Sequence, residues 1–335
     1  MFKPRLRITS HLIKLFENIA SATALINGAR LQEVLKVPLE KDAFARSVHS
    51  STWIEGNLLS LAQVRAVSEG QDVLVEGKQK LEVSNCIAAM RSTLKNKNKI
   101  VTEKDLLAVH ARMIKGLLPK TKAGKYRSVQ NYVVDARKKV IFTPPAPAKV
   151  IGRMKDLFTW LKDNDQHPIV RSAVFHHEFL TIHPFVDGNG RVARAIAQWL
   201  LWERGIDPLV TLGLDDFFAQ DRTRYYDMIQ QTREMDDDYT YWVEYVAEGL
   251  RSSVVIVQGR IKEGSFKLTQ VSLTPKQEEL VVLIGKYGVL GASQICKEMK
   301  VNRSRVNQLI LPLVRSGIII RAGAARAVRY RLNVK

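Results

Sequence analysis

The stretch His-Pro-Phe-Val-Asp-Gly-Asn-Gly-Arg-Val-Ala-Arg, residues 183–194, constrains this chain more than any other. An apolar helix-forming segment precedes it and another follows its glycines, so we expect two helices joined by a short polar loop. An imidazole, a carboxylate, two glycines and two arginines come together there. These residue types suit phosphoryl or nucleotidyl transfer, because that chemistry depends mainly on positioning and charge neutralisation.

The length and the cysteine content restrict the class of protein. A chain of 335 residues is long enough for two or three domains with cores of their own. Its two cysteines, Cys86 and Cys296, indicate neither a disulfide framework nor a metal-binding spacing. No apolar run approaches a membrane span, and residues 1–20 lack the uninterrupted apolar segment of a secretory signal. We therefore expect no membrane association and, by default, a cytoplasmic location.

The net charge of +19 is distributed unevenly. Residues 251–335 contain 16 Lys and Arg against 4 Asp and Glu, a net charge of +12. Such a basic segment favours nucleic acid or another polyanion as a partner. The alternative is a basic surface that only keeps the protein in solution.

The periodicity of apolar residues predicts a mainly α protein. Two β-prone runs, 132–134 and 140–142, predict one hairpin within residues 126–147. Residues 259–272 have weak periodicity and are interpreted as a linker. Helices are expected around residues 12–20, 40–55, 60–69, 101–117, 148–163, 168–182, 189–204, 216–233 and 239–258.

Residues 273–335 have a pattern of their own, three helices followed by two strands, which resembles a winged helix-turn-helix. The expected helices cover residues 274–287, 292–299 and 302–315, and the expected strands cover 318–321 and 328–332. The third helix presents residue types that contact bases and phosphates, so double-stranded DNA is a candidate partner. These residues are Arg303, Arg305, Asn307 and Gln308. Many winged helices serve only protein interaction or dimerisation, and that alternative stays open.

Residues 183–194 match the Fic family motif HPFx(D/E)GNGRxxR at every fixed position. The resemblance covers roughly residues 100–250, and the helical segment before it also looks related. It implies a Fic-type helical bundle with a β-hairpin flap, plus the small C-terminal domain. We accordingly divide the chain into an N-terminal helical region (1–99), a catalytic core (100–258), the linker (259–272) and the winged helix (273–335).

Two residues of the motif suit proton transfer and metal binding. The imidazole of His183 titrates near neutrality and can take a proton from an attacking hydroxyl, and the resemblance implies that it is the general base. Asp187 offers the hard oxygen ligand that Mg²⁺ prefers when it bridges nucleotide phosphates. The resemblance therefore implies ATP as the substrate and Mg²⁺ as the cofactor.

The rest of the motif suits phosphate binding. Gly188 and Gly190 let backbone N–H groups approach a phosphate where the loop enters a helix, and the helix dipole there favours negative charge. Arg191 and Arg194 can both reach phosphate oxygens. The predicted nucleotide-binding residues are Gly188, Asn189, Gly190, Arg191, Val192, Ala193 and Arg194, with Tyr225 and Tyr226 as candidates for the adenine pocket or, equally, for the core.

The two glycines also bear on the reaction. The kinase-like Doc branch has Ala and Lys at these two positions, so this chain resembles the majority of the family, which transfers AMP. The implied reaction moves AMP from ATP to a Ser, Thr or Tyr hydroxyl of a target protein held on the flap, residues 126–147. Transfer of another phosphate-containing group is an alternative. A DNA-binding regulator that uses the core as a nucleotide sensor is another.

A second motif, Ser-Thr-Trp-Ile-Glu-Gly-Asn at residues 51–57, resembles the family's inhibitory motif (S/T)xxxE(G/N). Ser51 and Glu55 share a helix face. The resemblance implies that Glu55 pairs with Arg194 and keeps it from the γ-phosphate of ATP. The same glutamate could instead position a water for AMP removal, as in some relatives. Relatives often dimerise, so a homodimer is a further expectation.

Overall fold

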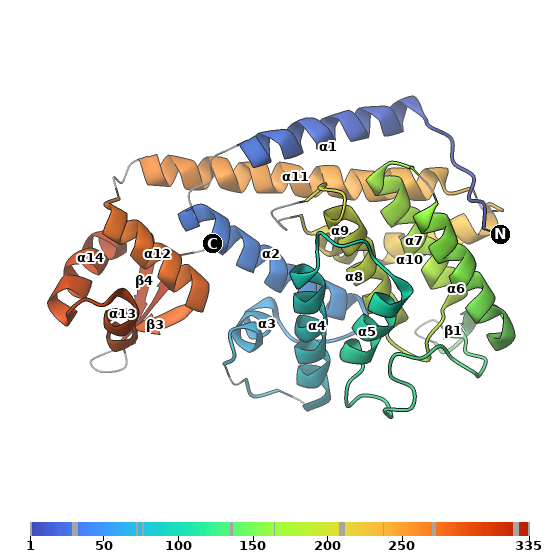
Figure 1. Cartoon of the computed structure of the whole chain (residues 1–335), viewed down its shortest axis with the longest axis horizontal. Helices are drawn as coiled ribbons and strands as arrows, with labels where there is room; N and C mark the ends of the chain where they lie inside the picture. Colours follow the sequence, from blue (N-terminus) through green and yellow to red (C-terminus); the bar gives the residue numbers. More distant parts are fainter. Residues whose placement is uncertain are drawn as a thin grey trace. The chain divides into compact units, whose positions relative to one another are not determined.

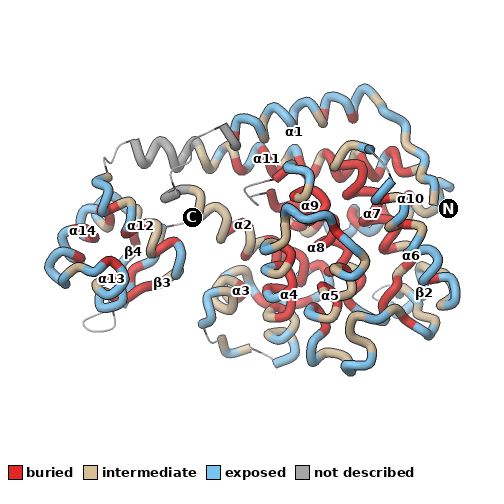
Figure 2. Tube along the Cα trace, in the orientation of Figure 1, coloured by how far each residue is buried: buried red, intermediate tan, exposed pale blue. Residues whose placement is uncertain are grey.

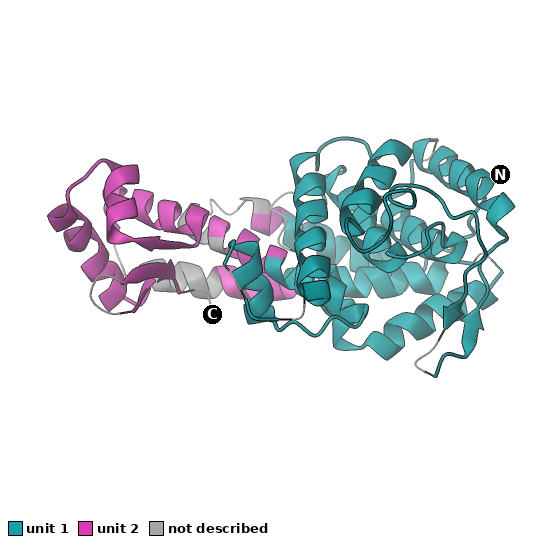
Figure 3. Cartoon of the chain, turned by 90° about the horizontal axis from the view of Figure 1, so that it is seen from below, with its two compact units in different colours: residues 1–23, 45–208, 212–254 teal, residues 24–44, 209–211, 255–335 magenta. Residues whose placement is uncertain are grey.

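The computed structural model describes residues 2–28, 33–71, 73–75, 77–134, 137–163, 165–207, 212–236, 238–269, 273–323 and 328–333. These residues form fourteen helices and five short strands, so the expected mainly α class is confirmed (Figure 1). None of the helices in the described ranges is long and apolar enough to cross a membrane. The chain divides into two compact units, residues 1–23, 45–208 and 212–254 in one, and 24–44, 209–211 and 255–335 in the other (Figure 3).

The first five helices are α1 (Ser10–Gly28), α2 (Glu33–Ile54), α3 (Leu61–Ser68), α4 (Gly77–Lys95) and α5 (Glu103–Met113). Thr102 caps α5, and its hydroxyl accepts a hydrogen bond from Asp105 N. Gly56, at φ 93°, lies just beyond the end of α2, in the left-handed region that favours glycine. The sequence analysis missed α4 because its buried face includes small and polar residues, Asn85, Cys86 and Ala89 among them, which weakens the apolar contrast.

Helices α7 (Pro168–Ile182) and α8 (Asn189–Trp202) pack against each other at the centre of the first unit. Almost all of their residues are buried (Figure 2). Helix α6 (Pro147–Lys162) packs on α7, while α4 and α5 pack on α8. The loop that joins α7 to α8 is the 183–188 segment of the motif, so a buried helix pair holds that loop on both sides.

Two helix assignments from the sequence were wrong. The single helix expected at 216–233 is two helices, α9 (Leu214–Gln220) and α10 (Arg222–Glu234), because Asp221 leaves helical geometry and its side chain caps Arg224 N. Helix α11 (Thr240–Thr269) runs through most of the stretch interpreted as a linker, and residues 270–272 lie outside the described residues. Its polar C-terminal part is tied by an ion pair of 2.7 Å between Arg260 Nη1 and Asp42 Oδ2.

The expected hairpin is present within residues 126–147. Strands β1 (Val133–Val134) and β2 (Val140–Phe142) pair antiparallel, with Val133 opposite Phe142 and Val134 opposite Val140. The pairing shifts by one residue between these two positions, which is a β-bulge.

The C-terminal part of the second unit contains α12 (Pro275–Tyr287), α13 (Ala292–Met299) and α14 (Arg303–Arg315), as expected. Strands β3 (Val289–Gly291), β4 (Ile319–Ala322) and β5 (Arg329–Leu332) form an antiparallel sheet in the order β3-β5-β4. The sequence analysis missed β3, which is only three residues long. The three helices and the sheet enclose a core of Leu280, Ile284, Ile295, Val306, Leu309, Leu313 and Ile319 with their apolar neighbours. The winged-helix assignment stays a prediction.

Two leucines on α14 provide a matched test of this core. Leu313 is fully buried, whereas Leu311 on the same helix is 51% exposed. We expect Leu313→Ala to destabilise this part of the chain by about 2–5 kcal/mol, because it leaves a cavity. Leu311→Ala is expected to cost about 0.5 kcal/mol or less. Hydrogen exchange of amides in residues 273–323 of the full chain measures the difference, and equal loss of protection in both variants would contradict it.

Candidate nucleotide-binding site

The loop between α7 and α8 has a conformation that its own residues enforce. His183 ends α7 in the left-handed region at φ 49°, and Gly188 precedes α8 at φ 81°. The Asn189 side chain accepts a hydrogen bond from Phe185 N and donates one to Phe185 O, both at 2.9 Å. Asn189 therefore closes the loop through its side chain.

His110 on α5 packs against this loop and hydrogen-bonds to its backbone, a role that the sequence analysis did not predict. Its ring stacks on the fully buried ring of Phe185, with centroids 3.6 Å apart. Its Nδ1 accepts a hydrogen bond from Gly124 N at 3.0 Å, so its Nε2 carries the proton and donates to Asp187 O at 3.1 Å. Burial lowers the pKa of His110 to about 4, which keeps this tautomer neutral. A lone histidine on a helix carries no sequence signal for such a role.

His183 is held in a form that suits a base. Its Nδ1 lies 3.4 Å from Leu180 O and donates to that carbonyl, which leaves the lone pair on Nε2. Burial lowers the pKa of His183 to about 4, against the opposing effects of the Leu180 carbonyl and of Glu55. The ring is therefore neutral at neutral pH and able to accept a proton.

The first turn of α8 is the candidate anion-binding part of the site. The first N–H groups of a helix have no partner within the helix, and the dipole there favours negative charge. Arg191 is 5% exposed and its Nη2 lies 3.4 Å from Asp187 Oδ1, while the Asp187 side chain itself is 54% exposed. Val192 and Ala193 are fully buried, so they contribute packing of the helix and present no side chain to a ligand.

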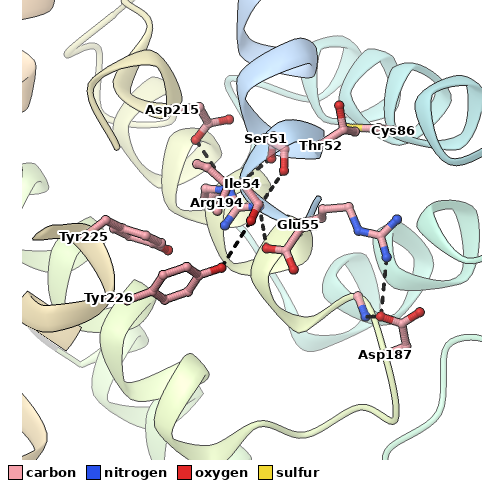
Figure 4. A network of polar contacts seen from close by, with 12 residues as sticks. Ser51, Thr52, Ile54, Glu55, Cys86, Asp187, Arg194, Asp215, Tyr225 and Tyr226 are labelled. Atoms are coloured by element: carbon pink, nitrogen blue, oxygen red, sulfur yellow. Dashed lines mark hydrogen bonds and ion pairs between the residues drawn. The ribbon is translucent and has the colours of Figure 1, made fainter. Parts of the chain in front are cut away.

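The structure brings Arg194 and Glu55 together, as the second motif predicts (Figure 4). Arg194 Nη2 donates to Glu55 Oε1 at 2.8 Å and to Ser51 O at 2.7 Å, and its Nε donates to Ser51 Oγ at 3.0 Å. Burial alone would raise the pKa of Glu55, but the charges of Arg194 and Arg191 and the hydrogen bond from Arg194 together outweigh it, so the pKa is lowered. Both side chains are thus ionised at neutral pH.

Glu55 also occupies the space above Gly190. A Cβ atom placed on Gly190 would lie 2.1 Å from Glu55 Oε1, so no other residue fits here while Glu55 is in place. A carboxylate resting on the first turn of a helix takes the position that any other anion would use there. Residues 51–57 and the 183–194 motif therefore meet at the first turn of α8.

Helix α9, which the sequence analysis merged with α10 and assigned no role, binds the C-terminal half of α2. Ser47 Oγ donates to Asp215 Oδ2 at 3.1 Å, and Ser50 Oγ donates to Asp216 Oδ1 at 2.7 Å. Asp215 also lies 3.9 Å from Arg194 Nε. Burial raises the pKa of Asp215 to about 6. Adjacent acidic residues are common at helix starts, so Asp215 and Asp216 did not indicate this contact with α2 in the sequence.

The two candidate adenine-pocket tyrosines have different environments. Tyr225 is 1% exposed, its hydroxyl lies 2.9 Å from His176 Nε2, and its ring stacks on Phe218, so it belongs to the core. Tyr226 is 39% exposed and donates from its hydroxyl to Ile54 O at 3.3 Å, at the end of α2. Only Tyr226 has a face available to a ligand.

Part of the chain matches a known protein family. Residues 100–201 match the Fic/DOC family. A protein adenylyltransferase Fic of Aedes aegypti is 31% identical over 252 residues, 72% of this chain and 47% of that protein. Protein adenylyltransferase fic-1 of Caenorhabditis elegans is 30% identical over 253 residues. The chain thus spans about half the length of these curated relatives.

Solved structures are similar as well. A Fic family protein from Desulfovibrio desulfuricans aligns over 100% of this chain and 99% of its own, with a TM-score of 0.71 and 26% identity. Fic-1 of Caenorhabditis elegans, residues 134–508, aligns over 74% of this chain and 71% of its own, with a TM-score of 0.61 and 25% identity. The Fic fold expected from the motif is confirmed.

The state of His183 can be measured directly. Because burial disfavours its charged form, we expect its ring to titrate near pH 4, well below the usual 6.5, and to stay neutral from pH 6 to 8. Long-range ¹H–¹⁵N spectra, assigned with His183→Gln, report both the midpoint and the tautomer. A midpoint near 6.5, or a proton on Nε2 in the neutral form, would contradict the arrangement.

Proposed function

We propose that this chain, which carries a domain of the Fic/DOC family, transfers AMP from ATP to a Ser, Thr or Tyr hydroxyl of a target protein. Two features of the site together carry the proposal. One is the neutral ring of His183, and the other is an anion-binding position on the first turn of α8 that Arg191 and Arg194 make positive. Relatives named protein adenylyltransferase support the same reaction. Because the chain covers only part of their length, the activity is a proposal for this protein.

In this proposal the first-turn N–H groups of α8 and the two motif arginines bind the phosphates of ATP. The target's hydroxyl oxygen attacks the α-phosphorus, and Nε2 of His183 accepts its proton. The bond between the α-phosphorus and the bridging oxygen breaks, and pyrophosphate leaves. Leu180 keeps the other ring nitrogen protonated, so the base faces the nucleophile in one tautomer.

The residues present fit a Mg²⁺ ion held mainly by the nucleotide. Asp187 is an exposed carboxylate beside the anion position, and no group of three His, Cys, Asp or Glu side chains in the described ranges could hold a metal alone. Mg²⁺ commonly takes one or two carboxylates and completes its shell with phosphate and water oxygens. Bound by Asp187, it would neutralise phosphate charge.

Glu55 is the proposed autoinhibitory residue. While its carboxylate rests on Gly190 and pairs with Arg194, the γ-phosphate of ATP meets both an occupied position and a negative charge. ATP then binds unproductively or not at all. An alternative role for Glu55 is to position a water that removes AMP from a modified target.

The hairpin is the proposed docking element for the target. Its apolar side chains are unusually exposed, with Tyr132 at 55%, Val134 at 48%, and Val140 and Ile141 at 47% each. An extended segment can pair with an exposed strand through backbone hydrogen bonds, which holds a hydroxyl in line. Such pairing suits a target segment of varied sequence.

The first test is the removal of Glu55. We expect Glu55→Gly to raise AMP incorporation at least about tenfold, since freeing the anion position is worth 1.4 kcal/mol or more. The measurement is mass spectrometry of the purified protein after incubation with ATP and Mg²⁺, where an AMP-sized adduct on the chain itself is expected. Glu55→Gln, which keeps the shape and removes the charge, should give an intermediate rate.

The control is the double variant Glu55→Gly/His183→Ala, which should form no adduct. Equal incorporation in the wild type and in Glu55→Gly would refute autoinhibition. An adduct from another nucleotide in preference to ATP would replace AMP as the transferred group. Faster loss of AMP from a pre-modified protein in the wild type than in Glu55→Gly would favour the AMP-removing alternative.

A second candidate function is binding of double-stranded DNA through residues 273–335. The observation that favours it is the polar face of α14, where Arg303, Arg305, Asn307 and Gln308 are all exposed while the opposite face packs in the core. Strands β4 and β5 add exposed Arg321, Arg329 and Arg331. Contacts of this kind bind phosphates and base edges.

Salt dependence tests this candidate. We expect the full chain to bind a 30-base-pair duplex, and Arg303→Ala/Arg305→Ala to reduce the slope of log K against log salt by about two. Fluorescence anisotropy at several salt concentrations measures the slope. Lys14→Ala/Lys95→Ala removes the same charge from exposed helix positions elsewhere and serves as control. No binding by the wild type at low salt, or equal weakening in both double variants, would eliminate DNA as a partner.

A further inference from the structure

Two arginines outside the motif, Arg127 and Arg233, contact the backbone around His183. The first, Arg127, lies at the start of the hairpin segment and is 3% exposed. Its Nε donates to His183 O at 2.9 Å, and its Nη1 donates to Val129 O at 3.1 Å. Its Nη2 donates to Pro145 O, beyond β2. One guanidinium thus joins both ends of the hairpin to the backbone of His183.

The second arginine, Arg233 near the end of α10, contacts the partner of the base itself. Its Nη2 donates to Leu180 O at 3.1 Å, the same carbonyl that accepts from His183 Nδ1. Its guanidinium carbon lies 3.7 Å from the ring centroid of Phe142 in β2. Arg233 therefore contacts the hairpin strand on one side and the hydrogen-bond acceptor of His183 on the other.

We propose that Arg233 is a positioning residue that couples strand β2, through Phe142, to the orientation of His183. The proposal rests on the proposed function, in which β2 receives the target and His183 takes its proton. Its physical basis is that a planar guanidinium satisfies both contacts at once, a stacked ring and a carbonyl in its plane. A change in β2 that moves the Phe142 ring moves the cation, and with it the carbonyl that orients the base.

The charges around His183 determine in which direction its pKa moves when Arg233 is changed. Arg233 and Arg127 both disfavour protonation of the His183 ring, while Glu55 and the Leu180 carbonyl favour it. Removing the cation of Arg233 therefore raises the pKa of His183 and moves its titration to higher pH. Moving the Arg233 guanidinium away from Leu180, without removing its charge, should also raise the pKa of His183, but by less.

The experiment follows the His183 ring by long-range ¹H–¹⁵N spectra in four variants of the full chain. We expect Arg233→Gln to shift the midpoint to higher pH, Arg233→Lys to restore most of the wild-type value, and Phe142→Leu to give a smaller upward shift. Ile141→Leu changes the neighbouring side chain of β2, which is 47% exposed, and should leave the midpoint unchanged. This readout does not depend on enzymatic activity.

The outcomes separate the coupling from the proposed function. An unchanged midpoint in Arg233→Gln would overturn the positioning role, and identical behaviour of Phe142→Leu and Ile141→Leu would overturn the link to β2. In a Glu55→Gly background, the acid limb of AMP incorporation should shift with the midpoint in each variant. If that background forms no AMP adduct while the spectra behave as expected, the proposed function fails and the positioning role stands.

Discussion

The site depends on one buried cation, the guanidinium of Arg194 on α8. It is almost completely buried, and such a charge is stable only when its donors are satisfied. Ser51 and Glu55 of α2 supply those partners, with Asp215 of α9 nearby. When Glu55 leaves, Ser51 still accepts two hydrogen bonds from Arg194, and these bonds hold the guanidinium in place. A phosphate would then meet a preformed cation.

The sequence was most informative where a residue's role follows from its own chemistry and backbone position. The motif predicted a loop between two helices, and the structure has that loop, with Gly188 in the left-handed region that favours glycine. The second motif predicted that Glu55 meets Arg194, and the two side chains form a hydrogen-bonded ion pair.

What the sequence could not predict depends on contacts between distant segments. His110 supports the motif loop from 77 residues away, and Asp216 binds Ser50 across 166 residues. Periodicity also failed where a helix has a mixed surface: α4 was missed and α11 was ended too early. Sequence position also made Tyr225 a plausible pocket residue, but contacts with distant aromatic residues such as Phe218 place it in the core.

The position of Glu55 along its helix has a consequence for how such a site switches. Glu55 directly follows Ile54, the last residue of α2, and its N–H bonds to Thr52 O within the final turn. Ser51, Thr52 and Ile54 of that turn are buried, whereas the Glu55 side chain is 32% exposed, so Glu55 can leave Arg194 without unfolding the turn. In the proposed function, basal turnover would therefore report how often this one side chain leaves Arg194. A partner that changes the stability of the Glu55–Arg194 pair by about 1.4 kcal/mol would change the open population about tenfold, with the rest of the fold unaltered.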